Sequence, residues 1–578
     1  MGGIDIIYLT ERNSRIRLGL YEKERYPVVL NMMTSVETKV SGCSEQLKYW
    51  SQIDWLKQEK IVKNLRNRIF RAQRLGYSHQ KIRSLQRLLM RSRANLLLSV
   101  RRVTQINKGK DTPGVDKEIA TTPELRMKLV KNWKMPKAKE VKRIYIPKKN
   151  GKMRPLGIPT LRDRIAQAIV SQALEPAWEA VFESNSYGFR PGRGCHDAIA
   201  QCFNRLVKRG NRTNDQWVLD ADIKGFFDNI SHEVIMEALK TFPGKNLIKE
   251  WLKAGFLDKG RKYETPFGTP QGGIISPLLA NIGLHGLQNL VEKDKLGFIR
   301  YADDFIVTAK TQKELEDAKE TIKTWMDGRG LELSEEKTKI IHIENGANYL
   351  GFNLRTYKGK LIIKPQKDKV LAYCKKIKDE VQKLYGALPE TVIRKLNPII
   401  RGFANHYRHV VSKEVFNYIS YRIWRILWHW AKRRHPGKNN QWIKNQYFKV
   451  IKGRDWIFSC NIQGRKGDSK LLTLDNMVDT PIIRFVKVKG DASPDDPSLK
   501  KYWKNRCTQM GKYYWAKGSK MEKIAINQGW KCPVCGEHLI NGEALETHHQ
   551  IPIKEGGADS IENMVHLHWY CHKSTHSK

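Results

Sequence analysis

Three aspartates in this sequence lie at the ends of apolar, strand-like runs, where charge is unfavourable without a partner. Asp303 and Asp304 are adjacent at a tight turn between two such runs, and Asp222 ends a third run just before a helix start. Mg²⁺ is usually held by a few carboxylates, and two ions about 3.5–4 Å apart serve nucleotidyl transfer. We therefore predict a two-Mg²⁺ site in which Asp222 and Asp303 bridge the ions and Asp304 is a lesser or supporting ligand. An isolated Asp-Asp pair, by contrast, is more often only a turn signal.

A second set of residues suited to metal binding lies near the C-terminus. Cys532 and Cys535 form a pair with two intervening residues, and His568 and Cys571 form another pair with the same spacing. Two such pairs are typical of a structural Zn²⁺ site with tetrahedral ligands from two turns. A redox role is disfavoured because no βαβ pattern surrounds the first pair.

The charge balance indicates the kind of partner. The chain has 105 lysines and arginines against 59 aspartates and glutamates, a net charge of +46. This excess points to nucleic acid, and the alternative is a basic protein kept soluble by its charge. The sequence contains no run of 18 or more apolar residues, so it predicts no transmembrane helix, and it contains no P-loop motif. Nine cysteines without a disulfide framework indicate a reducing compartment, which we expect to be a bacterial cytoplasm, with an organelle as the alternative.

The elements that must position these groups are of two kinds. Residues 45–105 and 365–455 have apolar residues at helical spacing with Arg and Lys between them, and the second segment interleaves Trp and Tyr. Such helices can present Arg to RNA phosphates, but core packing and a solvated basic face explain the same pattern. Residues 106–355 mix short strands and helices, and residues 490–497 are typical of a linker.

The hairpin Tyr301-Ala302-Asp303-Asp304 resembles the Tyr-x-Asp-Asp box of reverse transcriptases, and further boxes follow in the order of that family. The resemblance covers about residues 50–455 and implies an RNA-directed DNA polymerase shaped as a right hand. The other boxes are residues 143–159, 186–193, 217–228, 268–279, 336–339 and 349–352.

The resemblance also implies roles for residues around the carboxylates. Lys148 and Arg154 would hold the incoming triphosphate, since cations stabilise charge on a transferring phosphoryl group. Gln271 would contact the nucleotide from a Gly-rich turn, and Phe227 would be the steric gate against the ribose 2′-hydroxyl. Lys337 would act near the leaving pyrophosphate, whereas an exposed lysine after a turn is more often merely solvated.

Residues 394–407 resemble domain X, the thumb of group II intron proteins, and the fingers box with Asp163 and Arg164 resembles the same family. The family binds its own intron RNA and helps that RNA to splice. Basic helices would clamp phosphates of the folded ribozyme, while the splicing chemistry would belong to the RNA.

The segment between the two Cys/His pairs resembles the HNH (ββα-metal) endonuclease motif. A hairpin would supply His548 as a metal ligand and His549 as general base. His572 and His576, four residues apart on one helix face, would complete a nuclease Mg²⁺ site, and Asn563 would orient the loop and the base. The alternative is a zinc-stapled binding module without cleavage.

We therefore expect an α+β multidomain chain: a right-hand polymerase of fingers, palm and helical thumb, then a DNA-binding region and a zinc-stapled HNH module. The predicted function is retrohoming, in which the protein binds intron RNA in a lariat ribonucleoprotein and nicks the second strand of a double-stranded DNA target. The polymerase then extends the new 3′ end along the intron RNA with dNTPs. One alternative is a splicing cofactor with a vestigial polymerase or nuclease, and another is a reverse transcriptase of a non-intron element such as a retron. The predicted boundaries are a leader at 1–44, fingers and palm at 45–355, thumb at 356–455, DNA-binding region and linker at 456–515, and HNH module at 516–578.

Overall fold

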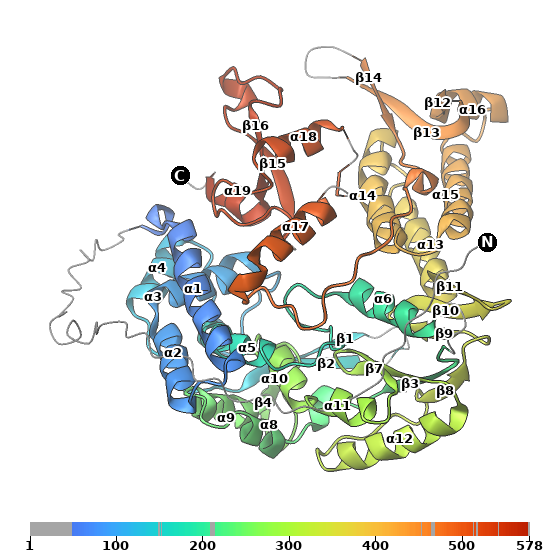
Figure 1. Cartoon of the computed structure of the whole chain (residues 1–578). Helices are drawn as coiled ribbons and strands as arrows, with labels where there is room; N and C mark the ends of the chain where they lie inside the picture. The colour runs from blue at the N-terminus through green and yellow to red at the C-terminus, as the bar shows by residue number, and fades with distance from the viewer. Residues whose placement is uncertain are drawn as a thin grey trace, which may run out of the picture. The chain divides into compact units, whose positions relative to one another are not determined.

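The computed structural model describes residues 49–575 except 148–150, 152, 209–213, 452, 464–468, 512–513, 516–517 and 542. The predicted leader at residues 1–44 lies outside these residues. The described chain begins with a helical layer (Figure 1), which confirms the helical prediction for this region. Its helices are α1 (Trp55–Arg74), α2 (His79–Arg91), α3 (Arg93–Arg101) and α4 (Pro123–Lys131).

Helix α5 (Leu161–Glu179) is the buried centre of this layer and packs against α1, α2 and α3. The same part of the chain also forms a four-stranded sheet of order β2-β1-β4-β5. Strands β1 and β2 form an antiparallel hairpin in which Ile146 pairs with Arg154. The strands are β1 (Val141–Pro147), β2 (Met153–Ile158), β4 (Phe256–Asp258) and β5 (Arg261–Tyr263).

The palm sheet has the strand order β6-β7-β3-β8. Helix α12 (Gln312–Asp327) packs against β3, β7 and β8, and helix α6 (Cys195–Leu206) packs against β6. Short helices complete this part of the chain. The strands are β3 (Trp217–Asp222), β6 (Gly297–Tyr301), β7 (Asp304–Ala309) and β8 (Lys339–His342). The short helices are α7 (Phe226–Asn229), α8 (His232–Ala238), α9 (Lys245–Lys253), α10 (Ser276–Gly283) and α11 (Leu287–Glu292).

A brace holds the β6–β7 turn from behind. The Tyr187 N–H donates to the Arg300 carbonyl at 2.9 Å, and the Arg300 N–H donates to the Asn185 carbonyl at 3.0 Å. The buried Arg300 guanidinium donates to the Ala302 carbonyl at 3.2 Å. Gly188 lies so close to Ala302 that a Cβ there would clash with its backbone. The box at residues 186–193 is thus part of the support for the turn that carries Asp303.

The thumb packs a helical layer onto a small sheet of order β11-β10-β9, and one core cluster joins it to the palm. In helix α15 the side chain of Trp430 is buried, while Trp424 is half-buried and Arg425 is exposed. The strands are β9 (Ala347–Tyr349), β10 (Phe352–Tyr357) and β11 (Lys360–Pro365). The helices are α13 (Lys367–Gln382), α14 (Pro389–Tyr407), α15 (Lys413–Arg434) and α16 (Asn440–Tyr447).

After the thumb the chain forms a sheet of order β12-β13-β14 and then returns to the palm (Figure 1). Residues 490–497, predicted as a linker, are packed instead of tethered in solvent. Asp495 is 5% exposed and accepts from Arg66 of α1 at 2.7 and 2.8 Å. The Pro and Gly residues of this segment correctly predicted that it has no regular secondary structure. They could not predict that a buried ion pair holds it in place. The elements are β12 (Phe448–Ile451), β13 (Arg454–Gln463), β14 (Ser469–Thr473) and α17 (Lys500–Gly511).

The C-terminal module is a ββα unit with one preceding helix. Strands β15 and β16 pair antiparallel, with His548 opposite Val565, and α19 follows β16 directly. Its elements are α18 (Lys520–Asn527), β15 (Leu545–His549), β16 (Met564–His568) and α19 (Trp569–Thr575). Among the described residues, no helix is long and apolar enough to cross a membrane.

The buried ion pair between Arg190, in the box at residues 186–193, and Glu179, at the end of α5, tests how much this support contributes to stability. Both side chains are 1% exposed, and two hydrogen bonds of 2.9 and 3.0 Å join them. Glu179→Gln should cost about 3–5 kcal/mol, since it leaves a buried guanidinium uncompensated. Thermal unfolding should show a clear drop in the midpoint. The control Glu332→Gln breaks the exposed pair with Lys224 and should cost no more than about 1 kcal/mol. Equal effects of the two changes would contradict the bracing role.

Candidate active sites

The carboxylates converge because of strand register. Asp222 pairs with Asp304 across β3 and β7, and Asp220 pairs with Ile306. Cross-strand partners point to the same face and side chains alternate along a strand, so Asp220, Asp222 and Asp304 share one face of the palm sheet. Asp303 occupies the turn between Tyr301 and Asp304, which are themselves paired. Four carboxylates therefore meet at one end of the sheet.

The electrostatics of this cluster reflect burial and like charge. Burial, together with the charges of Asp220, Asp222 and Asp303, raises the pKa of Asp304 to about 7. Burial and Asp222 raise the pKa of Asp220 to about 6. The pKa of Asp303 is raised mainly by burial, then by Asp222. Such a cluster favours protons or cations, and bound divalent ions would relieve the repulsion.

Cations lie beside the carboxylates. The Lys337 ammonium forms an ion pair with Asp222 and is 65% exposed. The charges of Arg154, from the β1–β2 hairpin, and Lys337 oppose the raised pKa of Asp303. The structure therefore brings Arg154 and Lys337 to the carboxylates, whereas Lys148 lies outside the described residues.

The residues predicted to contact the nucleotide lie on a loop and a short helix that are tied together. The Thr269 N–H donates to the Phe227 carbonyl at 2.7 Å, and the Phe227 ring lies 6.4 Å from that of Phe189. The Gln271 carbonyl accepts from the Gly157 N–H of β2 at 2.7 Å. These bonds join fingers and palm beside the carboxylates, and they place Phe227 and the half-buried Gln271 on adjoining segments.

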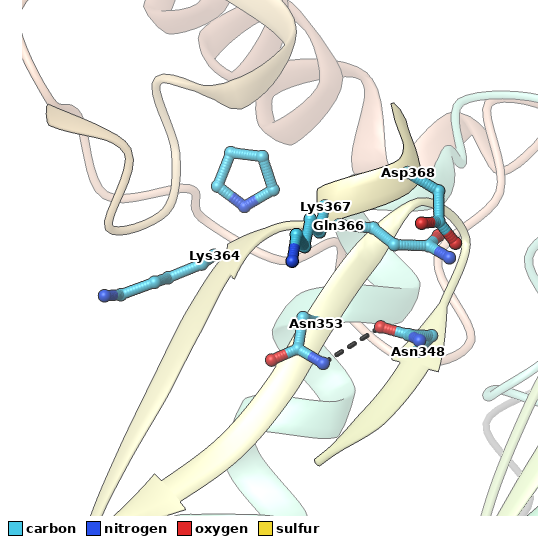
Figure 2. A pocket seen from close by; sticks show the side chains of 7 residues that line it. Asn348, Asn353, Lys364, Gln366, Lys367 and Asp368 are labelled. Atoms are coloured by element: carbon cyan, nitrogen blue, oxygen red, sulfur yellow. Dashed lines mark hydrogen bonds between the residues drawn. The ribbon is translucent and has the colours of Figure 1, made fainter. Parts of the chain in front are cut away.

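Hollows lie beside the predicted gate and in the thumb. One of about 290 Å³ includes Phe227, Pro155 and Thr269 in its lining, so it adjoins the predicted gate. The other, of about 310 Å³, lies between the β9–β11 sheet and the start of α13. Figure 2 shows its polar lining, in which Asn353 donates to Asn348 at 2.9 Å. The second hollow includes none of the predicted catalytic residues.

The nuclease hairpin brings together most of its predicted residues. The rings of His548 and His572 lie 5.1 Å apart, and His572 also pairs with Glu546. The Nε2 of His549 lies 3.1 Å from Asp559, and hydrogen bonds from His549 and Lys520 lower the pKa of Asp559. His576 lies outside the described residues.

Asn563 ties the loop that follows β15. Its side-chain amide donates to the Ile551 and Ala558 carbonyls at 2.9 and 2.8 Å, and its oxygen accepts from the Ile551 N–H at 2.9 Å. The loop between His549 and β16 is thereby closed on itself, next to the pair of His549 with Asp559.

The two Cys/His pairs converge into one buried cluster. One ligand atom from each of Cys532, Cys535, His568 and Cys571 lies within 4.8 Å of the others. His568 Nδ1 lies 3.2 Å from Cys535 Sγ, and His568 Nε2 lies 3.3 Å from the His538 carbonyl. A ligating histidine commonly donates its other N–H in this way, so the residues fit a structural metal ion.

Three acidic residues of these sites were missed in the sequence analysis. Asp220 precedes Asp222 by two residues, and Glu546 precedes His548 by two, so period-two alternation on a strand is the signal that could have found both. Asp559 lies in a loop ten residues from His549, and no local pattern marks it.

Comparison with known protein families matches four segments of this chain. Residues 50–133 match the N-terminal domain of reverse transcriptase, and residues 146–354 match reverse transcriptase (RNA-dependent DNA polymerase). Residues 372–448 match the group II intron maturase-specific domain, and residues 532–578 match HNH endonuclease. The fold and the two sites therefore define an RNA-directed DNA polymerase joined to an HNH endonuclease, classes that use divalent metal ions.

Two relatives of similar sequence show which family this chain belongs to. Protein YkfC of Escherichia coli is 34% identical over 319 residues, which cover 47% of this chain and 83% of that protein. The group II intron-encoded protein LtrA of Lactococcus lactis is 31% identical over 418 residues, which cover 54% of this chain and 69% of that protein. A telomerase structure from Candida albicans covers 54% of this chain and 65% of that one at 12% identity and a TM-score of 0.33. The chain belongs to the family of group II intron-encoded proteins.

The raised pKa of Asp304 leads to a prediction about stability. Its folded value of about 7 exceeds the ordinary 3.8, so folding takes up a proton and the metal-free protein loses stability as pH rises from about 4 to 7. Asp304→Asn should therefore raise the unfolding midpoint in chelator at pH 8, by about 1 °C per kcal/mol of repulsion removed for a unit of this size. It should also reduce the extra stability that Mg²⁺ provides.

The control for this change is Asp317→Asn, on the exposed face of α12, which should alter neither quantity. Thermal melts with and without Mg²⁺ decide the outcome. A lower midpoint for Asp304→Asn in chelator would show that the carboxylates do not repel one another as described.

Proposed function

We propose that this protein binds its intron RNA, assists splicing, nicks the second strand of a DNA target and primes cDNA synthesis there. The observation that supports this most strongly is the presence, in one chain, of the palm carboxylates, a maturase-specific segment and an HNH hairpin. The related LtrA is itself named an intron-encoded protein.

In the polymerase, Asp222 and Asp303 would bridge two Mg²⁺ ions, and Asp304 would assist from the same sheet end. Bound there, the ions would supply charge neutralisation at the triphosphate and activation of the primer hydroxyl. Arg154 and Lys148 would hold the triphosphate, and Lys337 would release Asp222 and turn to the leaving pyrophosphate.

In the nuclease, His549 would take a proton from the attacking water. Asp559 accepts from His549 Nε2, which leaves Nδ1 as the basic atom of the neutral ring. His548, His572 and His576 would hold the metal ion that neutralises phosphate charge, and Asn563 would keep the loop in place.

Further parts of the proposal concern metals, partners and domains. Zn²⁺ would fill the cluster of Cys532, Cys535, His568 and Cys571. The intron RNA would contact basic helices such as α15, double-stranded DNA would contact residues 456–515, and dNTPs would enter beside Phe227. The net charge of +46 supports polyanionic partners. We place the complex in a bacterial cytoplasm, or in an organelle, with the domain boundaries predicted from the sequence.

Two substitutions should separate the activities. Asp303→Ala should abolish cDNA synthesis while RNA binding and splicing persist, because it removes only a bridging ligand. His549→Ala should stop nicking of the second strand, while extension of an annealed primer continues, because the polymerase site is intact. Purified protein, intron RNA and DNA target, assayed for splicing, nicking and cDNA, test both. Each variant is the control for the other.

The proposal fails if a folded Asp303→Ala protein loses splicing as fully as cDNA synthesis. The nuclease assignment fails if His549→Ala nicks the target at the normal rate, since the base would then lie elsewhere.

The gate provides a separate prediction. Phe227→Val should admit ribonucleotides more readily, since the aromatic wall beside the hollow no longer excludes the 2′-hydroxyl. Incorporation of rNTPs relative to dNTPs measures this. Phe189→Leu, which alters the neighbouring ring without removing the gate, is the matched control. Unchanged discrimination in Phe227→Val would remove this residue from that role.

A further inference from the structure

A second Cys/His cluster lies where the thumb meets the palm, away from the nuclease module in the sequence. One ligand atom from each of Cys195, His196 and His406 lies within 4.8 Å of the others. Cys195 and His196 begin helix α6 of the palm, and His406 lies in the last turn of α14 in the thumb. The cluster thus joins two elements that are about 200 residues apart in sequence.

The orientation of His196 is that of a metal ligand. Its Nε2 lies 2.7 Å from the His406 carbonyl, which can only accept, so Nε2 carries the proton. In the neutral ring the lone pair is then on Nδ1, which lies 3.7 Å from Cys195 Sγ. Ligand atoms of a tetrahedral zinc ion stand about 3.3–3.8 Å apart, given the usual Zn–N and Zn–S lengths. Sulfur and nitrogen are therefore already at the separation that such an ion requires.

The C-terminal cluster shows the same arrangement. There, too, one nitrogen of a histidine faces a cysteine sulfur and the other lies within hydrogen-bonding reach of a backbone carbonyl. The histidine is His568, the sulfur belongs to Cys535, and the carbonyl belongs to His538. The two clusters differ in donors, since the C-terminal one offers three sulfurs and one nitrogen, and the other offers one sulfur and two nitrogens. One thiolate with two imidazoles suits a borderline-soft ion such as Zn²⁺ with water as the fourth ligand.

The surroundings hold the cluster in place. His409 packs its ring 5.0 Å from His196, and its Nδ1 lies 2.9 Å from the Ile483 carbonyl. The Phe485 ring packs against both, tilted at 5.4 Å from His196 and edge-on at 5.3 Å from His409. Palm, thumb and the returning segment thus all contact the cluster.

We propose that Cys195, His196 and His406 bind a second zinc ion, which fixes helix α14 of the thumb to helix α6 of the palm. The neighbouring Tyr407 hydroxyl donates to the Gly351 carbonyl at 3.1 Å, beside the turn between β9 and β10. The ion would therefore also hold that turn, whose Tyr349 donates to the Asp304 carbonyl at 3.2 Å. This site is separate from the polymerase and nuclease metals and does not depend on the proposed retrohoming.

Metal content of the full-length, nucleic-acid-free protein tests the proposal. Mass spectrometry should find two zinc equivalents in the native chain, and one in Cys195→Ser or His406→Gln. Cys202→Ala changes the other cysteine of α6, which is buried and outside the cluster, and should retain both zinc ions. One equivalent in the native protein, or two in a folded Cys195→Ser protein, would overturn the site, leaving only a thiol–imidazole hydrogen bond.

Cobalt titration of the metal-free native protein needs no variant, so it tests the site even if the substituted proteins do not fold. Two tetrahedral sites should fill, one with strong sulfur-to-cobalt absorption from three thiolates and one with weak absorption from a single thiolate. Hydrogen exchange in residues 403–407 should slow as the second site fills. A single tetrahedral cobalt site, or hydrogen exchange that does not change as the second site fills, would contradict the proposed zinc site between α6 and α14.

Discussion

Mutual repulsion among carboxylates at the end of strands β3 and β7 determines what the rest of the palm must do. Burial and like charge raise the pKa of Asp304 to about 7, so the metal-free site is unfavourable by itself. A rigid support is needed to hold such a site open for cations. Arg300, Gly188 and the residues paired with them supply that support by fixing the turn from behind.

The two candidate active sites, in the palm and in the nuclease module, both depend on strand register to place their side chains. Each places polar side chains two residues apart on a strand of an antiparallel pair, so that they share a face. The palm hairpin rests on a large apolar core. The nuclease hairpin has only a small core, which includes Cys532, Cys535 and Cys571 themselves. A small module of this kind usually depends on bound metal for its stability.

The sequence was informative wherever chemistry and local pattern coincide. The strand pattern with its turn predicted the Asp303 hairpin, and equal spacing predicted the cluster of Cys532 and His568, both of which the structure brings together. Asp559, by contrast, meets His549 only through the fold of a loop. The packing of residues 490–497 depends on Arg66, more than 400 residues away, and the meeting of Cys195 with His406 depends on thumb docking. Such long-range contacts leave no local period in the sequence.

The central claim is that the palm carboxylates exist to hold two metal ions at the reacting phosphate. The most direct measurement is anomalous diffraction from crystals of the protein with primer, RNA template, a non-hydrolysable dNTP and Mn²⁺. The account predicts two manganese peaks about 3.5–4 Å apart, both in contact with Asp222 and Asp303. A single peak, or ions bound without Asp303, would contradict it.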